Sequence, residues 1–297
     1  MAKIAVELEQ AVTARINAGG PGSTRSRLLG GGIGWQVGDV LCTSGPHDRR
    51  FEERHQQVSI AMVVAGTFQY RAETGLRVRH EVMTPGSLML GSYGRRFDCG
   101  HDHAIGDRCI AFWYEPEYFE RIASDAGVKH AKPIFPDVRI PVVRELSPLV
   151  AQACGGVVGV ETPWDEISVR LAALAVQLVH GLPSRLIDST PSSQKSVTSV
   201  LRAIERDPQA EWSLEAMAGA ARLSPYHFLR TFETVAGVTP HQYVLRTRLR
   251  EAATRIVTED RKIVDVALEC GFGDVSNFNR AFRTEFGCSP RHYRTAK

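Results

Sequence analysis

The residues best suited to chemistry in this chain of 297 residues lie between positions 99 and 109. Two thiols and two imidazoles occur there, at Cys99, His101, His103 and Cys109, and His55 precedes them. Thiolates and imidazoles are ligands for zinc and other soft or borderline metals. If Cys99, His101 and His103 lay on one strand, their side chains would share a face, because alternate residues do. The pattern permits a metal site, although its spacing matches no structural zinc motif.

The same stretch permits two interpretations without a metal. A thiol redox or electrophile sensor would use Cys99 and Cys109, and it needs a lowered thiol pKa. Arg108 and the histidines are the neighbouring basic groups that could lower that pKa. A polar loop with one buried thiol, Cys109 ahead of the apolar run 110–114, needs no chemistry at all. The sequence leaves both interpretations open.

Catalysis has one place in this sequence. A metal-dependent enzyme would take its ligands from His55, His101, His103 and Asp107. No nucleophile elbow, P-loop or dinucleotide-binding glycine fingerprint occurs elsewhere. Together with the helical repeat described below, this leads us to expect a protein that is not an enzyme.

Composition limits the class of protein. The chain is 43% apolar, and no apolar run approaches the ~18 residues of a membrane span. No charged segment followed by an apolar one opens the sequence, so no secretory signal is expected. The six cysteines lack the spacing of a disulfide scaffold, which favours a reducing compartment. We expect two domains in the cytoplasm and no membrane partner.

Residues 262–294 predict a helix, a tight turn and a second helix. The first helix carries apolar residues at helical spacing, namely Ile263, Val266, Ala267 and Cys270. Gly271 supplies the left-handed backbone that ends a helix, and Asp274 can cap the next one. The apolar stripe of that second helix comprises Phe278, Ala281, Phe282 and Phe286. Two helices around such a turn form a helix-turn-helix unit.

The second helix leaves a polar face outward. Its members are Ser276, Asn277, Asn279, Arg280 and Arg283. Hydroxyl, amide and guanidinium groups on an exposed helix can donate to base edges and phosphates. Double-stranded DNA is therefore the expected partner of this face.

The same pattern occurs once before, fifty residues upstream. The repeated aromatic positions are Phe228, Phe232 and Tyr243, then Phe278, Phe282 and Tyr293. Arg222 stands where the second copy has Gly271, and an Arg in a left-handed turn costs ~1 kcal/mol, which suggests a reshaped first turn. Thr239 and Pro240 begin a connecting helix that should end near Thr258. That helix would be ~28 Å long, close to the ~34 Å between successive major-groove faces.

The remainder of the chain changes rhythm twice. From residue 35 to about 114, short β-branched or aromatic runs alternate with turn signals, which is typical of an antiparallel β barrel or sandwich. Helical periodicity returns after Pro116, and residues 182–195 are rich in Pro and Ser, as linkers are. Residues 1–18 predict an amphipathic helix, and the glycine-rich residues 19–34 predict a flexible arm.

The motif I-x-x-V-A-x-x-x-G-F-x-D-x-S-x-F-x-R-x-F-R-x-x-F-G-x-S-P-x-x-Y-R, from Ile263 to Arg294, resembles the signature of AraC/XylS-type transcriptional regulators. The likeness covers roughly the last hundred residues. It implies an α+β fold with an N-terminal cupin-like β barrel, dimerisation helices and a C-terminal all-α tandem helix-turn-helix domain. The segments expected are an arm at 1–34, the effector barrel at 35–116, a dimerisation segment at 117–181, a linker at 182–195 and the DNA-binding domain at 196–297.

The resemblance also implies a function. An activator that binds a small-molecule effector, forms a homodimer and contacts RNA polymerase is expected. Base reading then falls on Tyr226, Leu229 and Arg230 in the first unit and on Ser276, Asn279 and Arg280 in the second, and we add His227, Asn277 and Arg283 as DNA contacts. Strand position suggests Phe68, Tyr70, His101 and Trp113 as the effector pocket. An architectural DNA binder, whose barrel only dimerises, is the alternative.

Basic residues cluster in the C-terminal third of the chain. Arg246, Arg248 and Arg250 fall in the connecting helix, and Arg291, Arg294 and Lys297 close the chain. We expect these side chains on a solvated face. Beside the helix-turn-helix repeat, such a face favours nucleic-acid binding.

Overall fold

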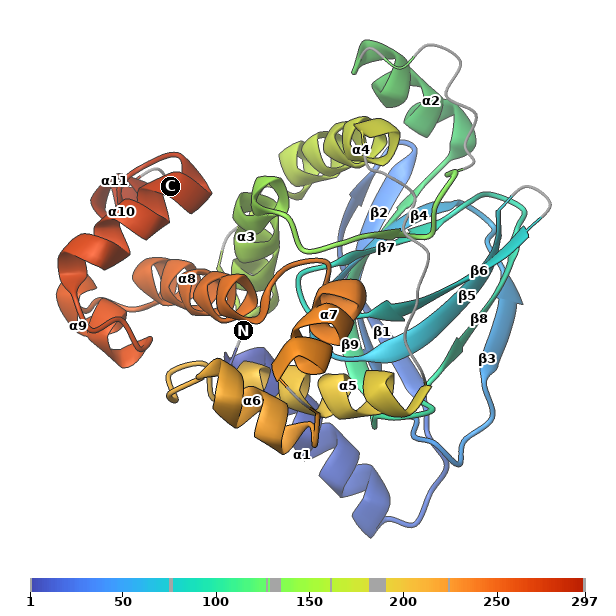
Figure 1. Ribbon diagram of the computed structural model, residues 1–297. Coiled ribbons are helices and arrows are strands. Elements are labelled where there is room, and N and C mark those ends of the chain that lie inside the picture. Colours follow the sequence, from blue (N-terminus) through green and yellow to red (C-terminus); the bar gives the residue numbers. More distant parts are fainter. Residues whose placement is uncertain are drawn as a thin grey trace. The chain divides into compact units, whose positions relative to one another are not determined.

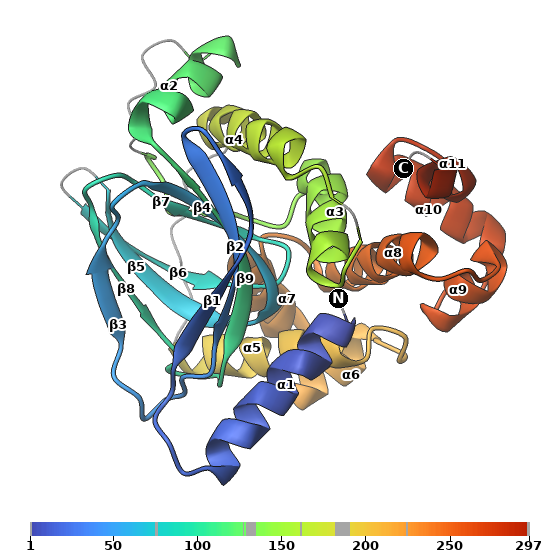
Figure 2. The ribbon, with the colours of Figure 1, turned by 180° about the vertical axis from the view of Figure 1, so that it is seen from behind.

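The computed structural model describes residues 2–74, 77–126, 128, 135–160, 162–181, 191–223 and 225–295. The chain forms two compact units. The sheet unit comprises Glu7–Pro141 and Pro163–Ile187, and the helical unit comprises Met1–Val6, Val142–Thr162 and Asp188–Lys297. Figure 1 labels most of the helices and strands of both units, and Figure 2 shows them from behind.

The sheet unit contains two antiparallel sheets. The six-stranded sheet has the order β1 (Thr24–Gly32), β2 (Trp35–Cys42), β9 (Asp107–Tyr114), β4 (Val58–Gly66), β7 (Leu88–Gly91) and β10 (Arg139–Ile140). The four-stranded sheet has the order β3 (Phe51–Arg54), β8 (Arg96–Gly100), β5 (Phe68–Thr74) and β6 (Arg77–Met83). Every residue of β4 is buried, as expected of a central strand, whereas β5 buries alternate residues.

The two sheets share one core. Ala61 and Cys109 of the six-stranded sheet cluster with Phe68 and Tyr70 of the four-stranded sheet. Such packing is that of a sandwich, in which the inner faces interdigitate. The sheets of one unit and the helices of the other confirm the α+β class. The described strands do not close into a single barrel, so the cupin-like barrel is not confirmed.

The glycine-rich segment after the first helix is a strand. Helix α1 spans Ala2–Asn17, as predicted, but residues 24–32 form β1 and pair with β2 from Thr24↔Cys42 to Gly32↔Trp35. The prediction of a flexible arm is therefore wrong for this segment. Ladder hydrogen bonds use backbone groups that glycine also has, so an adjacent strand can order a sequence of low strand propensity.

The segment 117–181 does not behave as one body. Helices α2 (Pro116–Asp125) and α4 (Trp164–Gly181) belong to the sheet unit, whereas the 3-10 helix η1 (Arg144–Leu146) and α3 (Ser147–Val157) belong to the helical unit. Most of α3 is buried, and a helix that is apolar on all sides needs partners on all sides. The structure therefore divides residues 117–181, expected to form one dimerisation segment, between its two units.

Helix α4 uses its apolar stripe within its own unit. Ile167, Leu171 and Ala175 are fully buried, and the Tyr114 hydroxyl donates to the Ser168 carbonyl oxygen at 2.9 Å. This packing accounts for much of the stripe that suggested a partner. No helix in the described ranges combines the length and apolarity that crossing a bilayer requires.

The rest of the helical unit comprises seven helices in the described part of the chain. They are α5 (Pro191–Arg206), α6 (Leu214–Ala220), α7 (Pro225–Ala236), α8 (Pro240–Thr258), α9 (Ile263–Glu269), α10 (Val275–Phe286) and α11 (Pro290–Thr295). The predicted linker is partly wrong, because Pro191–Lys195 begins α5; Pro is favourable in a first helical turn. Residues 182–190 of that linker lie outside the described residues.

The connecting helix has the predicted bounds. The Thr239 side chain accepts from the Gln242 backbone, and the Gln242 side chain accepts from the Thr239 N–H, which is a capping box. Pro240 occupies the first turn and the helix ends at Thr258. With 19 residues it is ~28 Å long, so the rod between the two repeated units is confirmed.

Candidate functional site

The sequence repeat is also a repeat of geometry. Its aromatic clusters are Phe228, Phe232 and Tyr243 in the first copy and Phe278, Phe282 and Tyr293 in the second. The two phenylalanine rings are 5.4 Å apart in both copies. The second phenylalanine meets the tyrosine edge to face, at 5.7 Å and 79° in the first copy and 5.4 Å and 80° in the second. Edge-to-face packing is favoured by the ring quadrupoles, and here it holds each second helix in the same pose.

The two turns share one backbone conformation. Gly271 has φ 85°, and Arg222 has φ 54°, the only positive φ outside glycine among the described residues. The Leu223 N–H reaches the Ala218 carbonyl at 3.0 Å, and the Phe272 N–H reaches the Ala267 carbonyl at 3.1 Å. Arg222 therefore accepts the left-handed strain, and the first turn keeps the shape of the second.

A carboxylate fixes the start of α10. The Asp274 side chain accepts from the Ser276 and Asn277 N–H groups, both at 3.0 Å. These two backbone donors lower the pKa of Asp274, because they stabilise its charged form. The cap thus sets the first turn of the helix, as predicted, and with it the orientation of the residues that follow.

The predicted outer face of α10 is accessible. Phe278 and Phe282 are fully buried, which turns the opposite side of the helix outward. On that side Ser276, Asn277, Arg280 and Arg283 are exposed and Asn279 is half-buried. The Arg280 guanidinium donates to the Asn277 amide oxygen.

An open groove of about 710 Å³ runs along this face. Its polar lining residues are Ser276, Asn279, Arg280, Arg283, Thr284, Ser289 and Arg291. Three guanidiniums around hydroxyl and amide groups form the kind of surface that binds phosphates and base edges. The side chains of Tyr226, His227, Leu229 and Arg230, expected to serve the same role on α7, lie outside the described residues.

The arginines of the connecting helix face inward. Arg248 donates to the carbonyl oxygens of Pro208, Ala210 and Gly271 at 2.7, 2.9 and 2.9 Å. Arg246 donates to the Val142 carbonyl at 2.7 Å, and Arg250 is 1% exposed. The prediction of a solvated basic face is wrong for this helix. Arg246 and Arg248 donate to backbone carbonyls instead, and Arg250 donates to the Thr247 hydroxyl and lies 3.9 Å from the Glu205 carboxylate. The five N–H donors of a guanidinium can serve several such acceptors at once.

The C-terminal basic residues divide. Arg294 donates to the Ile256 and Arg261 carbonyls at 3.0 and 2.7 Å, so it also has a structural role. Arg291 is exposed and lines the groove of α10. Lys297 lies outside the described residues.

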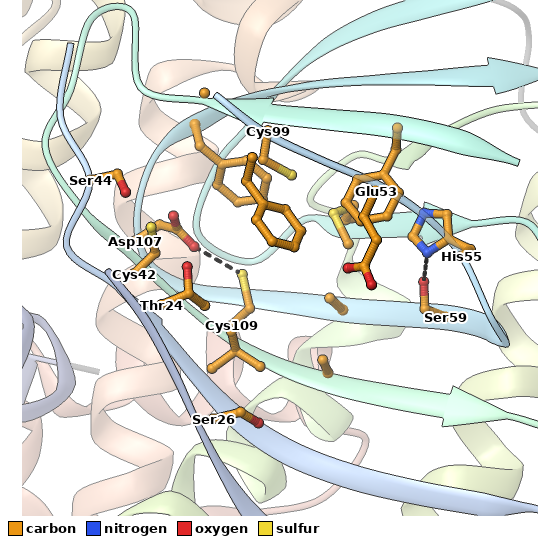
Figure 3. Close-up of a pocket in the computed structure, with 18 of the residues that line it drawn as sticks. Thr24, Ser26, Cys42, Ser44, Glu53, His55, Ser59, Cys99, Asp107 and Cys109 are labelled. Carbon is orange, nitrogen blue, oxygen red and sulfur yellow. Dashed lines mark hydrogen bonds between the residues drawn. The ribbon is translucent and has the colours of Figure 1, made fainter. Parts of the chain in front are cut away.

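The sheet unit contains a cavity of about 430 Å³. Of the residues expected to bind an effector, Phe68, His101 and Trp113 line it, whereas Tyr70 does not. Aromatic and apolar side chains dominate the interior, with Glu53, His55 and Asp107 among the polar groups (Figure 3). A cavity of this size and character suits a small organic molecule.

His55 and Tyr70 form a closed polar pair at one end. The Tyr70 hydroxyl donates to the Leu90 carbonyl at 3.2 Å and lies 2.7 Å from His55 Nε2, so that nitrogen must donate to it. His55 Nδ1 is then the acceptor for the Ser59 hydroxyl at 3.2 Å. Burial lowers the pKa of His55 to about 4. Both ring nitrogens of the neutral His55 imidazole are therefore engaged in hydrogen bonds, which leaves neither of them available to a metal ion.

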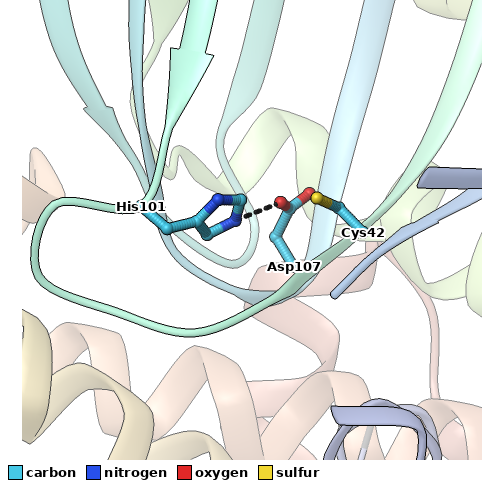
Figure 4. A group of neighbouring side chains, drawn as sticks. All are labelled: Cys42, His101 and Asp107. Carbon is cyan, nitrogen blue, oxygen red and sulfur yellow. Dashed lines mark hydrogen bonds and ion pairs between the residues drawn. The ribbon is translucent and has the colours of Figure 1, made fainter. Parts of the chain in front are cut away.

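A different group gathers at the other end of the cavity. The ligand atoms of Cys42, His101 and Asp107 all lie within 4.8 Å of one another. The His101 Nε2 is 2.7 Å from Asp107 Oδ1, and the Cys109 thiol donates to Asp107 Oδ2 at 3.5 Å. Figure 4 shows the Asp107 carboxylate between the His101 ring and the Cys42 thiol.

This group differs from the predicted metal set. His101, Cys99 and Cys109 line the cavity, but His103 falls in the turn after β8 and does not, and His55 lies at the far end (Figure 3). Strand β8 ends at Gly100, so the assumption of one strand carrying both histidines fails. Cys42 was missed because only the pairing of β2 with β9 brings it opposite Asp107.

The thiols do not have the environment of a redox sensor. Burial, reinforced by the Asp107 carboxylate, raises the pKa of Cys42, Cys99 and Cys109. Arg108 does not offset this, because both Nε and Nη2 of its guanidinium donate to Asp39 at 2.8 Å. The lowered pKa that a thiol sensor needs is absent.

Comparison with known proteins bears on the helical unit. Residues 217–296 match the family model described as a helix-turn-helix domain. The C-terminal region is an AraC-type helix-turn-helix domain. The chain is 34% identical over 108 residues to the probable transcriptional regulator LumQ of Photobacterium leiognathi, which is 36% of this chain and 44% of that protein.

Two further matches extend the comparison. The transcriptional activator RhaS of Salmonella schwarzengrund (strain CVM19633) is 28% identical over 191 residues, 62% of this chain and 68% of that protein. A crystal structure of the DNA-binding domain of AdpA in complex with a target DNA aligns at 28% identity with a TM-score of 0.33, covering 34% of this chain and 91% of that one. The chain spans less than half the length of the first curated relatives it matches.

Proposed function

We propose that this chain is a sequence-specific transcriptional regulator, an activator whose DNA binding responds to a small molecule. The observation that carries this proposal is the outer face of α10 within an AraC-type domain, where Ser276, Arg280 and Arg283 are exposed and Asn279 lines the same groove. The named relatives support it, since they are transcriptional regulators and include the activator RhaS. The protein would act in the cytoplasm, without catalysis of its own.

In this proposal α10 reads bases and its neighbours hold phosphates. Arg280, near the middle of the exposed face, can donate two hydrogen bonds to guanine O6 and N7. Asn279 can pair with adenine in the same groove, and Arg283 and Arg291, which line that groove, would contact the phosphates that flank it. Helix α7 would read the preceding major groove, with Tyr226, His227, Leu229 and Arg230 as its contacts.

The cavity of the sheet unit is the proposed effector site. Its volume of about 430 Å³ lies in the range of small-molecule pockets. Phe68 and Trp113 offer apolar contact, and Glu53 and His101 offer polar anchors. An effector could act only by binding two placements of the DNA-binding domain with different affinity. Homodimers of this chain and a contact with RNA polymerase complete the proposed mechanism.

The first test is selection of binding sites from random duplex DNA with the full-length protein. The affinity of the selected site is then measured for Arg280→Ala, with Arg144→Ala as the control, since Arg144 is exposed on η1 in the same unit. Loss of the bidentate contact should cost ~1 to 3 kcal/mol, or ~5- to 150-fold, at one base position. A loss of equal size on every sequence would leave a phosphate contact only.

The second test addresses the response to a ligand. Compounds that raise the melting temperature of the full-length protein are identified, and occupancy of the selected site is measured with each. An effector should change both the melting temperature and DNA occupancy, and Trp113→Ala should reduce both effects. Ligands that stabilise the chain while DNA occupancy stays constant would favour the architectural alternative.

A further inference from the structure

We propose that the thiol-rich end of the cavity is a binding site for a zinc-type divalent cation, with Cys42, His101 and Asp107 as ligands. The inference goes beyond the proposed function, because cation binding at this site does not depend on whether the chain binds DNA. It rests on strand register, interatomic distances and the charge of one buried carboxylate.

The six-stranded sheet presents two of the proposed ligands, Cys42 and Asp107, and a further thiol to the cavity. Cys42 and Asp107 are register partners on the antiparallel strands β2 and β9, so their side chains are direct cross-strand neighbours. Cys109 lies two residues beyond Asp107 on the same strand and faces the same side. The intervening Arg108 faces the other side, where it pairs with Asp39.

The opposite sheet supplies the remaining groups. Cys99 lies in β8, paired with Tyr70 of β5, and it lines the cavity. His101 follows directly after β8 and reaches across to Asp107. A cation at this point would therefore be held by both sheets, with protein groups on several sides.

The distances suit a small tetrahedral cation. Zinc with bonds of about 2.0 to 2.3 Å keeps its ligand atoms about 3.3 to 3.8 Å apart. The ligand atoms of Cys42, His101 and Asp107 lie within 4.8 Å of one another, and the His101–Asp107 pair is 2.7 Å apart. Side-chain shifts of about 1 Å would therefore bring every pair to the spacing that zinc needs, with the His101–Asp107 hydrogen bond opening to admit the ion. The Cys109 thiol, 3.5 Å from Asp107 Oδ2, is placed to act as a fourth ligand.

The charge of Asp107 is an independent argument. Its side chain is 9% exposed, and the ion pair it makes among the described residues is with His101, which is charged only when protonated. The equally buried Asp39, by contrast, pairs with both Arg27 and Arg108. A buried carboxylate normally has a permanent cation beside it. A divalent cation would supply that charge, and its thiolate and imidazole ligands are those that zinc prefers.

Cobalt(II) is the probe for the first experiment, because it takes zinc sites and reports thiolate ligation by a charge-transfer band in the near ultraviolet. Full-length protein without a histidine tag is stripped with a chelator, titrated with Co²⁺, and then challenged with Zn²⁺. One equivalent should bind with that band, and Zn²⁺ should abolish it. Cys42→Ser should lose at least half of the band, because Cys109 is the other thiol placed to bind the ion, and Asp107→Asn should weaken binding at least ~tenfold.

Cys288→Ser is the matched control, since Cys288 is a free thiol in the helical unit and should leave the titration unchanged. If circular dichroism shows that a ligand variant is misfolded, the test uses the wild-type protein instead. Zn²⁺ should then protect Cys42, but not Cys288, from alkylation, which mass spectrometry maps to each cysteine. Wild-type protein that binds neither ion, or binding that survives both ligand variants, overturns the site. DNA affinity of the metal-free protein, measured in parallel, tests the proposed function separately.

Discussion

Arg248 is predicted to be the residue that ties the two helix-turn-helix units to the connecting helix. Its guanidinium donates to Pro208 and Ala210, in the loop before α6, and to Gly271, in the turn between α9 and α10. The same group therefore joins the entry to the first unit with the turn of the second. We expect Arg248→Ala to loosen both.

The magnitude follows from these three contacts. A hydrogen bond to a charged donor contributes ~1.5 to 3 kcal/mol, but contributions of one side chain are not additive. Arg248 is half-buried, so water can hydrate some of the carbonyl oxygens that lose their donor in Arg248→Ala, which reduces the loss of stability. We therefore expect Arg248→Ala to lower the free energy of unfolding of the helical unit by about 3 kcal/mol. Arg248→Lys should recover less than half of this, because one ammonium cannot reach three divergent carbonyls.

Urea unfolding of the full-length protein, followed by far-ultraviolet circular dichroism, measures the effect. Arg283→Ala is the control, because Arg283 is exposed on the same unit and should change stability by less than ~0.5 kcal/mol. Hydrogen exchange should quicken in Arg248→Ala both in α6 and at the start of α10. If Arg248→Ala unfolds like Arg283→Ala, the three contacts do not carry the stability assigned to them.

Three further predictions concern single residues. Arg222→Gly should raise the free energy of unfolding by about 0.5 kcal/mol in urea titrations, since relief of the strain at φ 54° exceeds the entropy that glycine adds to the unfolded chain. Asp274→Ala should cost about 1 kcal/mol in the same assay and weaken DNA binding, because the cap of α10 is lost. The depressed pKa of His55, about 4 against 6.5, means that its neutral form stabilises the fold above pH 6.5 and that this contribution, up to about 3 kcal/mol, is lost as pH falls toward 4. In His55→Gln the free energy of unfolding should vary less between pH 4 and 6.5 than in the wild type. An equal pH dependence in both proteins would count against the burial of a neutral imidazole.

Local signals predicted the helical unit well. Thr239 with Gln242, Pro240, Asp274 and Gly271 are caps and turn residues whose chemistry involves neighbours within about four positions. The aromatic repeat added a second check, since equal spacing in sequence led to equal ring geometry. The local sequence of a helical segment of this kind contains most of the information needed to predict where its helices begin and end.

The sheet unit depends on pairings that sequence does not display. Residues 24–32 have little strand propensity, and β2 orders them. Cys42 and Asp107 are neighbours through register, not through sequence distance, so a search for ligands near Cys99 could find His101 and Cys109 but not Cys42. Alternate residues of a strand do share a face, but β8 ends at Gly100, before His101 and His103.

Arginine count was a poor guide to the DNA-binding face. Arg246, Arg248 and Arg250 are spaced at i, i+2 and i+4, so they cannot share one side of α8. The helix also packs against α3 and α7 as well as α9, α10 and α11, which covers it on several sides. Arg246 and Arg248 consequently bind backbone carbonyls, and Arg250 lies beside the Glu205 carboxylate. Among the described residues, the groove beside α10 offers exposed positive charge that phosphates can reach. Substitutions in α8 should thus alter DNA binding through stability, whereas Arg280 and Arg283 should alter it directly, and comparing unfolding with affinity for each variant separates the two causes.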